Sequence, residues 1–482
     1  MTFSSSHIYS AIRWALLARL SLLLLSWSST IVVMRMLTPG DYGIIAVATI
    51  FTGLAALLSE AGLNEVIIRR KQPDRAFQRA VLGAVLLLNL LLFTLLFFIS
   101  DFVATSFAIP QLRAVMPILA LQFIFNALAL LPVSLLERNM HYKAMAAIEG
   151  TAVIAGISCA LSLAYFNYGV WALVWSAVTA SVVRYLTACF FSRSAMLPSF
   201  RFSILYAERA FARAVLLNKL CWYLSNVADD FIVGKLLGKD KLGYYVVSKD
   251  LALLFQQKTA AIVHQISFPL LSQSVSTAQR NQLLLKGCAL LSLLVLPLTM
   301  VISSTAPLLV QVVLGERWQT IGPLLALMVL ALPLRVLNNL LGNAVSAAGY
   351  PQQRLFVQAV NLILITSLTA GGCWLWQLNG AVYGWLLANL LLLPVMIKVY
   401  LPRLQLASKP FLCQLLANWQ ALLLLCLLLL LQQLLPWPDT LATLAVNLVS
   451  AAFCYAIASW YFNRAGCDAL RKLLQPSYHS AG

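Results

Sequence analysis

Charged side chains inside apolar helical segments are the groups in this sequence whose type and spacing could do chemistry. The stretch from Val215 to Lys258 contains two apolar segments, each long enough to cross a lipid bilayer. A charge at membrane depth costs roughly 2.5–3.5 kcal/mol on insertion scales, so a charge that is kept there has a function or a partner. The charged residues in or beside the two segments are Lys219, Asp229, Asp230, Lys249, Asp250 and Lys258.

Arg19 and Lys219 are the candidates for binding an anion. Each lies about one and a half turns into an apolar helical segment. Polar residues seven and eleven positions later share the helical face of each cation. These residues are Ser26 and Thr30 after Arg19, and Asn226 and Asp230 after Lys219.

Two polar stripes that each carry a cation would suit a shared central cavity for an anionic substrate, especially a phosphate or a diphosphate. The alternative is that both long side chains reach the nearby membrane interface and bind nothing. The residues alone leave both interpretations open.

The three aspartates of this stretch also allow two interpretations. Asp229, Asp230 and Asp250 would bind a coupling ion or a proton if burial raises the pKa of their carboxyl groups. They would equally serve as structural partners of the nearby lysines. Asp230 does not pair easily with Lys219, because eleven residues of helix separate the two by about 16 Å.

Arg335 is a further embedded cation, which follows Pro333 in an apolar segment. Arg335 either binds substrate in the cavity or serves helix packing, and the sequence leaves both alternatives open. The predicted site therefore has three parts: substrate-binding cations, polar cavity groups and ion-coupling acids. The substrate-binding cations are Arg19, Lys219, Arg335 and Lys249. The polar cavity groups are Ser26, Thr30 and Asn226. The ion-coupling acids are Asp229, Asp230 and Asp250.

The chain contains an internal repeat. Without gaps, Ala15–Ile45 aligns with the sequence about 200 residues later. In this alignment Arg19 matches Lys219 and Gly43 matches Gly243. Such matches are stronger evidence of a repeat than matches between leucines, because leucine is common in so apolar a chain. Repeats of this kind are common in transporters.

The composition is that of a membrane protein with many spans. Of the 482 residues, 61% are hydrophobic and 10% are charged, whereas a soluble domain has roughly 25% charged residues. The mean hydropathy is +0.87. The net charge of +18 indicates contact with the cytoplasmic surface and anionic lipid rather than nucleic acid.

The sequence does not indicate an enzyme. Its nine cysteines are scattered without a CxxC pair, and its four histidines lie far apart, so we expect no metal site and no disulfide. The segment GKLLGKD at Gly234–Asp240 does not have the spacing of a phosphate-binding loop. We expect no cofactor.

Fourteen apolar runs are long enough to cross the hydrocarbon as helices. The predicted spans are 14–36, 42–64, 79–100, 112–135, 144–166, 169–191, 214–237, 242–264, 283–304, 320–345, 355–377, 380–400, 411–435 and 440–462. Of the 33 Lys and Arg residues, 22 fall on one side of the membrane and six on the other. The positive-inside rule then places both termini in the cytoplasm.

The repeat and the spans together predict two pseudo-symmetric lobes of six helices each, related by an axis along the membrane normal. The N-lobe covers residues 1–192, and a cytoplasmic linker covers 193–213. The C-lobe covers 214–400, and residues 401–482 form two additional helices and a cytoplasmic tail. Embedded charge between two such lobes favours a transporter that works by alternating access.

Four segments carry a resemblance to a known family. They are LTPGDYGIIAVATIF from Leu37, SEAGLNEVIIRRK from Ser59, LLERNMHYKAMAAIE from Leu135 and LGERWQTIGPLLALM from Leu314. In order and spacing they resemble the polysaccharide transporter family of the multidrug/oligosaccharidyl-lipid/polysaccharide exporter superfamily. Within that family, the chain looks most similar to lipopolysaccharide or exopolysaccharide flippases of the colanic-acid-exporter type.

The resemblance implies a fourteen-helix protein of the bacterial inner membrane. It implies a flippase that moves polyprenyl-diphosphate-linked oligosaccharide repeat units to the periplasmic leaflet, with membrane lipids and a polysaccharide polymerase as partners. It would place Arg19 and Lys219 near the diphosphate. The main alternative is an ion-coupled multidrug or cation antiporter, which would need an acid-dominated cavity. A membrane scaffold for polymer synthesis and a flippase for a lipid-linked peptidoglycan precursor are further alternatives.

Overall fold

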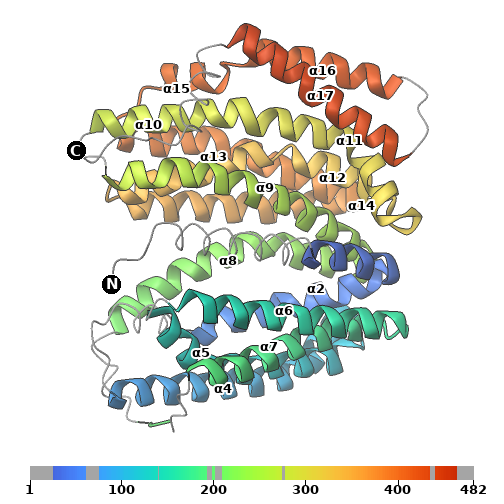
Figure 1. Ribbon diagram of the computed structural model, residues 1–482, viewed down its shortest axis with the longest axis vertical. Coiled ribbons are helices and arrows are strands. Elements are labelled where there is room, and N and C mark those ends of the chain that lie inside the picture. Colours follow the sequence, from blue (N-terminus) through green and yellow to red (C-terminus); the bar gives the residue numbers. More distant parts are fainter. Residues whose placement is uncertain are drawn as a thin grey trace, which may run out of the picture. The chain divides into compact units, whose positions relative to one another are not determined.

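The chain is all-helical over the residues that its structure describes. The computed structural model describes residues 25–60, 75–138, 141–192, 198–200, 209–273, 277–434 and 440–463. Every regular element in these ranges is a helix, and no strand occurs in them (Figure 1). The predicted all-helical fold class is therefore confirmed.

The chain divides into two compact units. The division runs through α8 (Arg209–Leu237) and again through the start of α9 (Lys239–Gln273). The lobe boundaries that the sequence predicts at residues 192, 213 and 400 stay predictions. The N-terminal unit consists of Met1–Tyr223 and Gly238–Gly243, and the C-terminal unit consists of Leu224–Leu237 and Tyr244–Gly482.

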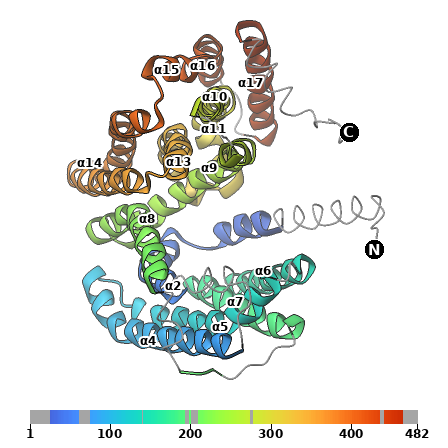
Figure 2. The same ribbon diagram turned by 90° about the vertical axis from the view of Figure 1, so that its left-hand side faces the viewer.

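Long helices that pack side by side form the N-terminal unit (Figure 2). Its helices are residues 25–36, α2 (Pro39–Glu60), α4 (Arg75–Phe107), α5 (Leu112–Arg138), α6 (Tyr142–Tyr165) and α7 (Val170–Ser192), followed by the first part of α8. α5 contacts both α4 and α7, and α7 also contacts α6. Phe77 and Val81 of α4 pack with Leu131 of α5 in a buried core.

The start of α2 shows why the LTPGDYG segment ends one helix and begins another. The Thr38 hydroxyl accepts a hydrogen bond from the Asp41 amide at 3.3 Å, and the Asp41 carboxylate accepts one from the Thr38 amide at 2.9 Å. This reciprocal pair is a capping box with Asp41 in the usual place of a glutamate. Pro39 begins the helix, where its missing N–H costs nothing.

The C-terminal unit contains the remaining helices. They are the rest of α8 and α9, α10 (Thr277–Leu290), η2 (Leu291–Val295), α11 (Leu296–Leu314), η3 (Glu316–Trp318), α12 (Ile321–Val329), α13 (Leu332–Ala347), α14 (Pro351–Leu404), α15 (Ser408–Leu415), α16 (Trp419–Leu434) and α17 (Leu441–Phe462). A buried core joins α10, α13 and α14, with Val336, Met396 and Tyr400 among its members. α16 and α17 contact each other and α11.

Ten helices of the described residues are long and apolar enough to cross a membrane. One of them is α14, whose backbone leaves helical geometry at Trp376 and Gln377, so it consists of two arms. α8 and α9 have 29 and 35 residues but are less apolar than these ten, because they carry the embedded charges. The predicted first span lies partly outside the described residues. The count of fourteen therefore stays a prediction.

The two arms of α14 run antiparallel and touch through glycines. A Cβ atom on Gly372 would overlap the carbonyl oxygen of Gly380, and a Cβ on Gly380 would overlap the carbonyl oxygen of Gly372. A Cβ on Gly384 would overlap the backbone of Leu368 in the same way. Small residues let helices in a membrane approach until their backbones touch. Gly371, next to this contact, faces open space.

A second pair of glycines makes a reciprocal contact within the N-terminal unit. A Cβ on Gly43 of α2 would overlap the carbonyl oxygen of Lys239, and a Cβ on Gly243 would overlap the carbonyl oxygen of Pro39. Both pairs of positions, 43 with 243 and 39 with 239, have the spacing of the sequence repeat. The repeat thus places equivalent residues on the two sides of one backbone contact.

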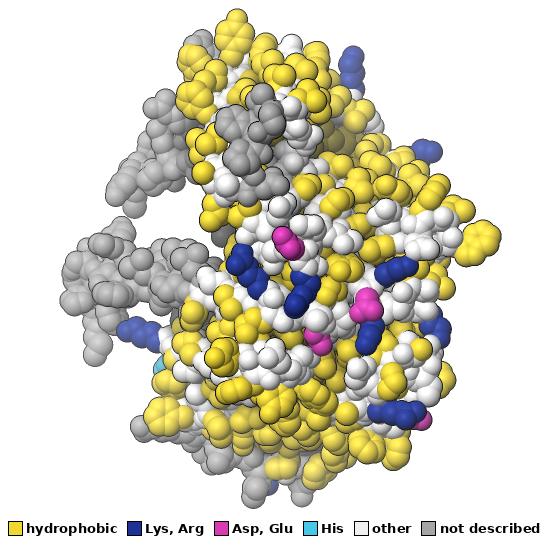
Figure 3. All heavy atoms as spheres, turned by 90° about the vertical axis from the view of Figure 1, so that its right-hand side faces the viewer, with side chains coloured by type: hydrophobic (Ala, Val, Ile, Leu, Met, Phe, Trp, Pro, Cys, Tyr) yellow, Lys and Arg dark blue, Asp and Glu magenta, His cyan; other side chains and the backbone are white. Residues whose placement is uncertain are grey.

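Large hydrophobic side chains lie on the outside of the helices. Phe98 is 74% exposed, Phe190 76% and Phe453 67%. On the face drawn in Figure 3, hydrophobic side chains are the most abundant kind and charged ones are few. Such a surface would promote association in water, whereas lipid chains cover it in a bilayer.

We expect Gly372→Ala to destabilise the protein by about 1–3 kcal/mol or more, because the added methyl group forces two backbones apart. Gly371→Ala is the matched control and should be neutral or slightly stabilising, since it adds helix propensity in open space. Thermal unfolding of the purified protein in detergent would measure both. Equal unfolding midpoints for the two variants would contradict the close approach of the two arms.

Candidate functional site

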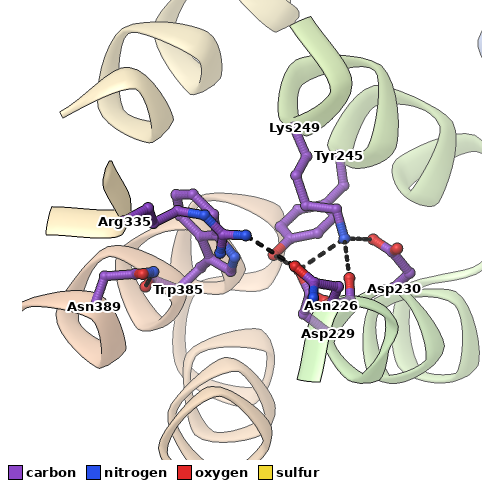
Figure 4. Close-up of polar contacts among 8 residues, drawn as sticks. All are labelled: Asn226, Asp229, Asp230, Tyr245, Lys249, Arg335, Trp385 and Asn389. Atoms are coloured by element: carbon purple, nitrogen blue, oxygen red, sulfur yellow. Dashed lines mark hydrogen bonds and ion pairs between the residues drawn. The ribbon is translucent and has the colours of Figure 1, made fainter. Parts of the chain in front are cut away.

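An ammonium group and two carboxylates meet inside the C-terminal unit (Figure 4). Asp229 and Asp230 project from α8, and Lys249 projects from the neighbouring helix α9. The Lys249 Nζ lies 3.0 Å from Asp229 Oδ2 and also donates to Asp230 Oδ1. The exposed fractions are 1% for Asp229, 9% for Asp230 and 4% for Lys249, so the three charges are withdrawn from solvent together.

Two further groups complete the surroundings of Lys249. Its Nζ donates a third hydrogen bond, 3.1 Å long, to the backbone carbonyl oxygen of Asn226. The hydroxyl of Tyr245, which is fully buried one turn before Lys249, donates to Asp229 Oδ2 at 2.9 Å. All three N–H donors of the ammonium group therefore have acceptors, as a buried charge requires.

Arg335 extends this network from α13. Its Nε donates to Gln256 Oε1 and its Nη2 to Asn226 Oδ1, both at 2.9 Å. The guanidinium carbon lies 5.4 Å from the centre of the Trp385 ring, on α14. Asn226 thus joins the two cations, because its side chain accepts from Arg335 and its backbone accepts from Lys249.

The hydrogen-bond partners of the two cations differ in charge. Lys249 is surrounded by two carboxylates, whereas both hydrogen-bonding side chains on Arg335 are neutral amides. In the described part of the chain, no carboxylate forms an ion pair with Arg335. One carboxylate oxygen, Asp229 Oδ1, is buried and accepts no hydrogen bond from the described residues. The site therefore offers a guanidinium group to an anion and a carboxylate oxygen to a cation or a proton.

The structure brings five of the predicted site residues together: Asn226, Asp229, Asp230, Lys249 and Arg335. Asp250 follows Lys249 but points to the exposed surface of α9.

The remaining predicted residues belong to the N-terminal part of the chain. Arg19 lies outside the described residues, and Lys219 is half-buried on the part of α8 that belongs to the N-terminal unit. The Thr30 hydroxyl donates to the carbonyl oxygen of Ser26 at 2.8 Å. Thr30 also lines a cavity of about 280 Å³ within the N-terminal unit, beside Tyr42.

Sequence reasoning missed two residues of the network, Gln256 and Trp385, and it missed the structural role of Tyr245. Gln256 follows Lys249 by seven residues, so helical spacing alone would have placed it on the same face. No spacing along the sequence relates Trp385 to Arg335, because Trp385 belongs to another helix, α14. Tyr245 lies four residues before Lys249, and its hydroxyl is a hydrogen-bond donor to a buried carboxylate.

Comparison with known proteins gives one family and several relatives. A family model described as "Polysaccharide biosynthesis protein" matches residues 32–323. The lipopolysaccharide biosynthesis protein WzxC of Escherichia coli (strain K12) is 23% identical over 348 residues, which cover 70% of this chain and 69% of that protein. The succinoglycan biosynthesis transport protein ExoT of Rhizobium meliloti (strain 1021) is 21% identical over 333 residues, or 68% of this chain and 67% of that protein.

Solved structures share the fold. The lipid II flippase MurJ in an inward closed conformation has a TM-score of 0.74 at 14% identity, over 94% of this chain and 99% of that one. An inward-facing multidrug resistance transporter of the MATE family has a TM-score of 0.61 at 14% identity, over 81% of this chain and 98% of that one. At such identities the likeness concerns the fold alone.

We expect Lys249→Met to destabilise the protein by about 3–5 kcal/mol, because it leaves two carboxylates buried without a cation. The variant that also carries Asp229→Asn and Asp230→Asn should recover much of that loss, since no buried charge is left unpaired. Unfolding of the purified protein in detergent would measure both.

The matched control is Arg113→Met, which breaks a pair whose side chains are 59% and 70% exposed and should cost at most about 1 kcal/mol. If Lys249→Met cost no more than Arg113→Met, the buried network would have no energetic importance.

Proposed function

The chain belongs to the polysaccharide biosynthesis protein family, and we propose that it is a flippase for polyprenyl-diphosphate-linked oligosaccharide repeat units. It is a multi-pass membrane transporter and not an enzyme. Its cargo would serve the synthesis of lipopolysaccharide or exopolysaccharide. Relatives named for lipopolysaccharide biosynthesis and for succinoglycan transport support this function, as does the fold shared with a lipid II flippase.

The observation that carries the proposal is the incomplete pairing of Arg335 among the residues that the structure describes. A guanidinium group has five N–H donors, and the two hydrogen bonds to Gln256 and Asn226 use two of them. The neutral amides orient the group without cancelling its charge. Trp385 supports one face of the guanidinium plane. The remaining donors form a planar set that matches two oxygen atoms of a phosphate group.

A sugar diphosphate needs such a site because it is too polar to enter hydrocarbon unaided. Removing charged and hydroxyl groups from water without new hydrogen bonds costs several kcal/mol for each group. A guanidinium group would offset this cost for the diphosphate, and the amides and hydroxyls of the surrounding helices would do so for the sugar. The polyprenyl chain would stay in the lipid.

Lys249 would act on this site indirectly. Its three donors are already used, so its part is to hold Asp229, Asp230 and Asn226 in place. We propose that Asp229 and Asp230 take up the coupling ion or proton, because one oxygen of Asp229 has no partner among the described residues. Asp250, on the exposed side of α9, is the third acid assigned to this role.

The N-terminal half would supply further cations. We propose that Arg19 and Lys219, which occupy equivalent positions of the repeat, contact the diphosphate. Ser26 and Thr30 would be polar groups of the same pathway.

The orientation in the membrane follows from charge. We propose that the protein lies in the bacterial inner membrane with both termini in the cytoplasm, because Lys and Arg are concentrated on that side. Translocation would then run from the cytoplasmic to the periplasmic leaflet. A polysaccharide polymerase would be the partner that consumes the translocated repeat unit.

A multidrug or cation antiporter is the second candidate. The fold shared with a MATE transporter and the two buried aspartates favour it. Against it stands the charge of the site, since Lys249 and Arg335 match the two carboxylates in number. A cavity that selects organic cations would need an excess of acids.

We expect Arg335→Gln to lower translocation by about 10-fold or more, because a lost charge-assisted hydrogen bond is worth roughly 1.5–3 kcal/mol. Arg335→Lys should restore part of the rate, since it keeps the charge but loses the planar fork. Lipid-linked oligosaccharide in each leaflet would be quantified in a deletion strain that expresses each variant. Arg113→Gln, in an exposed ion pair, is the control and should transport normally. Wild-type transport by Arg335→Gln at matched expression would reject the site.

Charge reversal at Arg19 and Lys219 tests the proposal that these two cations contact the diphosphate. Arg19→Glu combined with Lys219→Glu should cause lipid-linked oligosaccharide to accumulate in the cytoplasmic leaflet and abolish surface polysaccharide, because two cations for the diphosphate become anions. Rescue by this double variant would keep the flippase and reject these two residues. Unchanged lipid intermediates in the deletion strain itself would reject the flippase.

A further inference from the structure

A polar cavity lies inside the N-terminal unit, separate from the network around Arg335. It measures about 190 Å³, several times the ~30 Å³ that one water molecule occupies in the liquid. Helices α2, α4, α5, α6 and α7 all contribute to its wall. Its polar lining residues are Ser59, Asn89, Asn126, Ser134, Glu149 and Arg184.

Asn89 lines this cavity, and two hydrogen bonds fix the orientation of its amide. The residue is 2% exposed, and its Nδ2 donates to the carbonyl oxygens of Val85 at 2.8 Å and Ser59 at 3.3 Å. Both N–H groups are therefore used, and a flipped amide would lose both bonds. Its Oδ1 is buried and accepts no hydrogen bond from the residues that the structure describes.

Asn126 and Ser59 carry further acceptor oxygens in this wall, whereas Arg184 is a donor. Asn126 Oδ1 is likewise buried without a donor in the described part of the chain. The hydroxyl hydrogen of Ser59 is donated to the carbonyl oxygen of Ala56 at 2.7 Å, which leaves the oxygen as an acceptor. A buried acceptor without a donor costs about 1–3 kcal/mol. The cavity therefore favours a ligand that brings positive charge or hydrogen-bond donors.

An ion pair stands beside these acceptors. Arg184 Nη2 lies 2.5 Å from Glu149 Oε2, and the side chains are 41% and 52% exposed. An exposed pair of this kind contributes little stability. The carboxylate of Glu149 is thus able to exchange Arg184 for another cation at low cost, while Arg184 turns to solvent or lipid headgroups.

We propose that this cavity binds a small monovalent cation, of the alkali or ammonium type, through Asn89, Asn126, Ser59 and Glu149. Oxygen ligands of this kind suit hard cations. A single carboxylate among neutral oxygens favours a monovalent ion, because tight calcium sites use several carboxylates. The bound ion would join four helices of the N-terminal unit. This proposal does not depend on the transported substrate.

The test is thermal unfolding of the full-length protein in detergent with sodium, potassium, ammonium or choline chloride at equal ionic strength. A cation that binds the folded protein raises the unfolding temperature in a concentration-dependent manner. We expect one or more of the three small cations to do so and choline to fail, because it is too large for the oxygen ligands.

Variants of the cavity residues test whether the stabilising cation binds in this cavity. Asn89→Leu should lower the apparent affinity for the stabilising cation at least about 10-fold. Arg184→Gln should raise the affinity, because it removes the competing cation from Glu149. Asn126→Leu removes another oxygen of the proposed ligand set, so it should also lower the affinity and keeps the test valid if Asn89→Leu does not fold.

Two control variants change polar residues outside the cavity. Arg113→Gln removes an arginine from an exposed ion pair elsewhere in the same unit, and Asn379→Leu removes an exposed amide from α14. Both should show the cation dependence of the wild type. Equal unfolding temperatures of the wild type in all four salts would overturn the proposal. A cation effect that neither Asn89→Leu nor Arg184→Gln changes would also overturn it, because the ion would then bind elsewhere.

Discussion

The free-energy cost of holding charge away from water determines how helices pack in the C-terminal unit. Asp229, Asp230 and Lys249 are each at most 9% exposed, and none of them would remain charged there alone. Their mutual pairing requires α8 and α9 to pack in one register, with Asn226 and Tyr245 completing the hydrogen bonds. Because a misplaced helix would leave a buried charge unpaired, this cluster specifies how the two helices meet.

Arg335 shows how the same network leaves one charge available. Neutral amides and an aromatic ring hold the guanidinium group, so its orientation is defined while its charge is not cancelled. A carboxylate in the place of Gln256 would bind Arg335 more strongly but would compete with any anionic substrate. Within one connected cluster, Lys249 therefore has the surroundings of a positioning residue, and Arg335 has those of a binding residue.

Close backbone contacts arrange the helices that carry these groups. Lipid chains are as apolar as leucine, so helices in a membrane associate through packing and hydrogen bonds. Gly372 with Gly380, and Gly43 with Gly243, let backbones touch where any side chain would intrude. The second contact repeats the spacing of the internal repeat, which gives the second glycine of the LTPGDYG segment, Gly43, a structural reason.

The sequence by itself determined the membrane class, the all-helical fold and the identity of the embedded charges, because hydropathy and burial cost are properties of local segments. It also named five residues of the network around Lys249 and Arg335. It did not determine that both aspartates pair with Lys249, which lies 20 and 19 residues away on another helix. Nor did it indicate that Gln256 and Trp385 contact Arg335, although Gln256 shares a helical face with Lys249. Only the tertiary structure decided these partnerships, since they depend on the register and angle between helices and not on the pattern along any one helix.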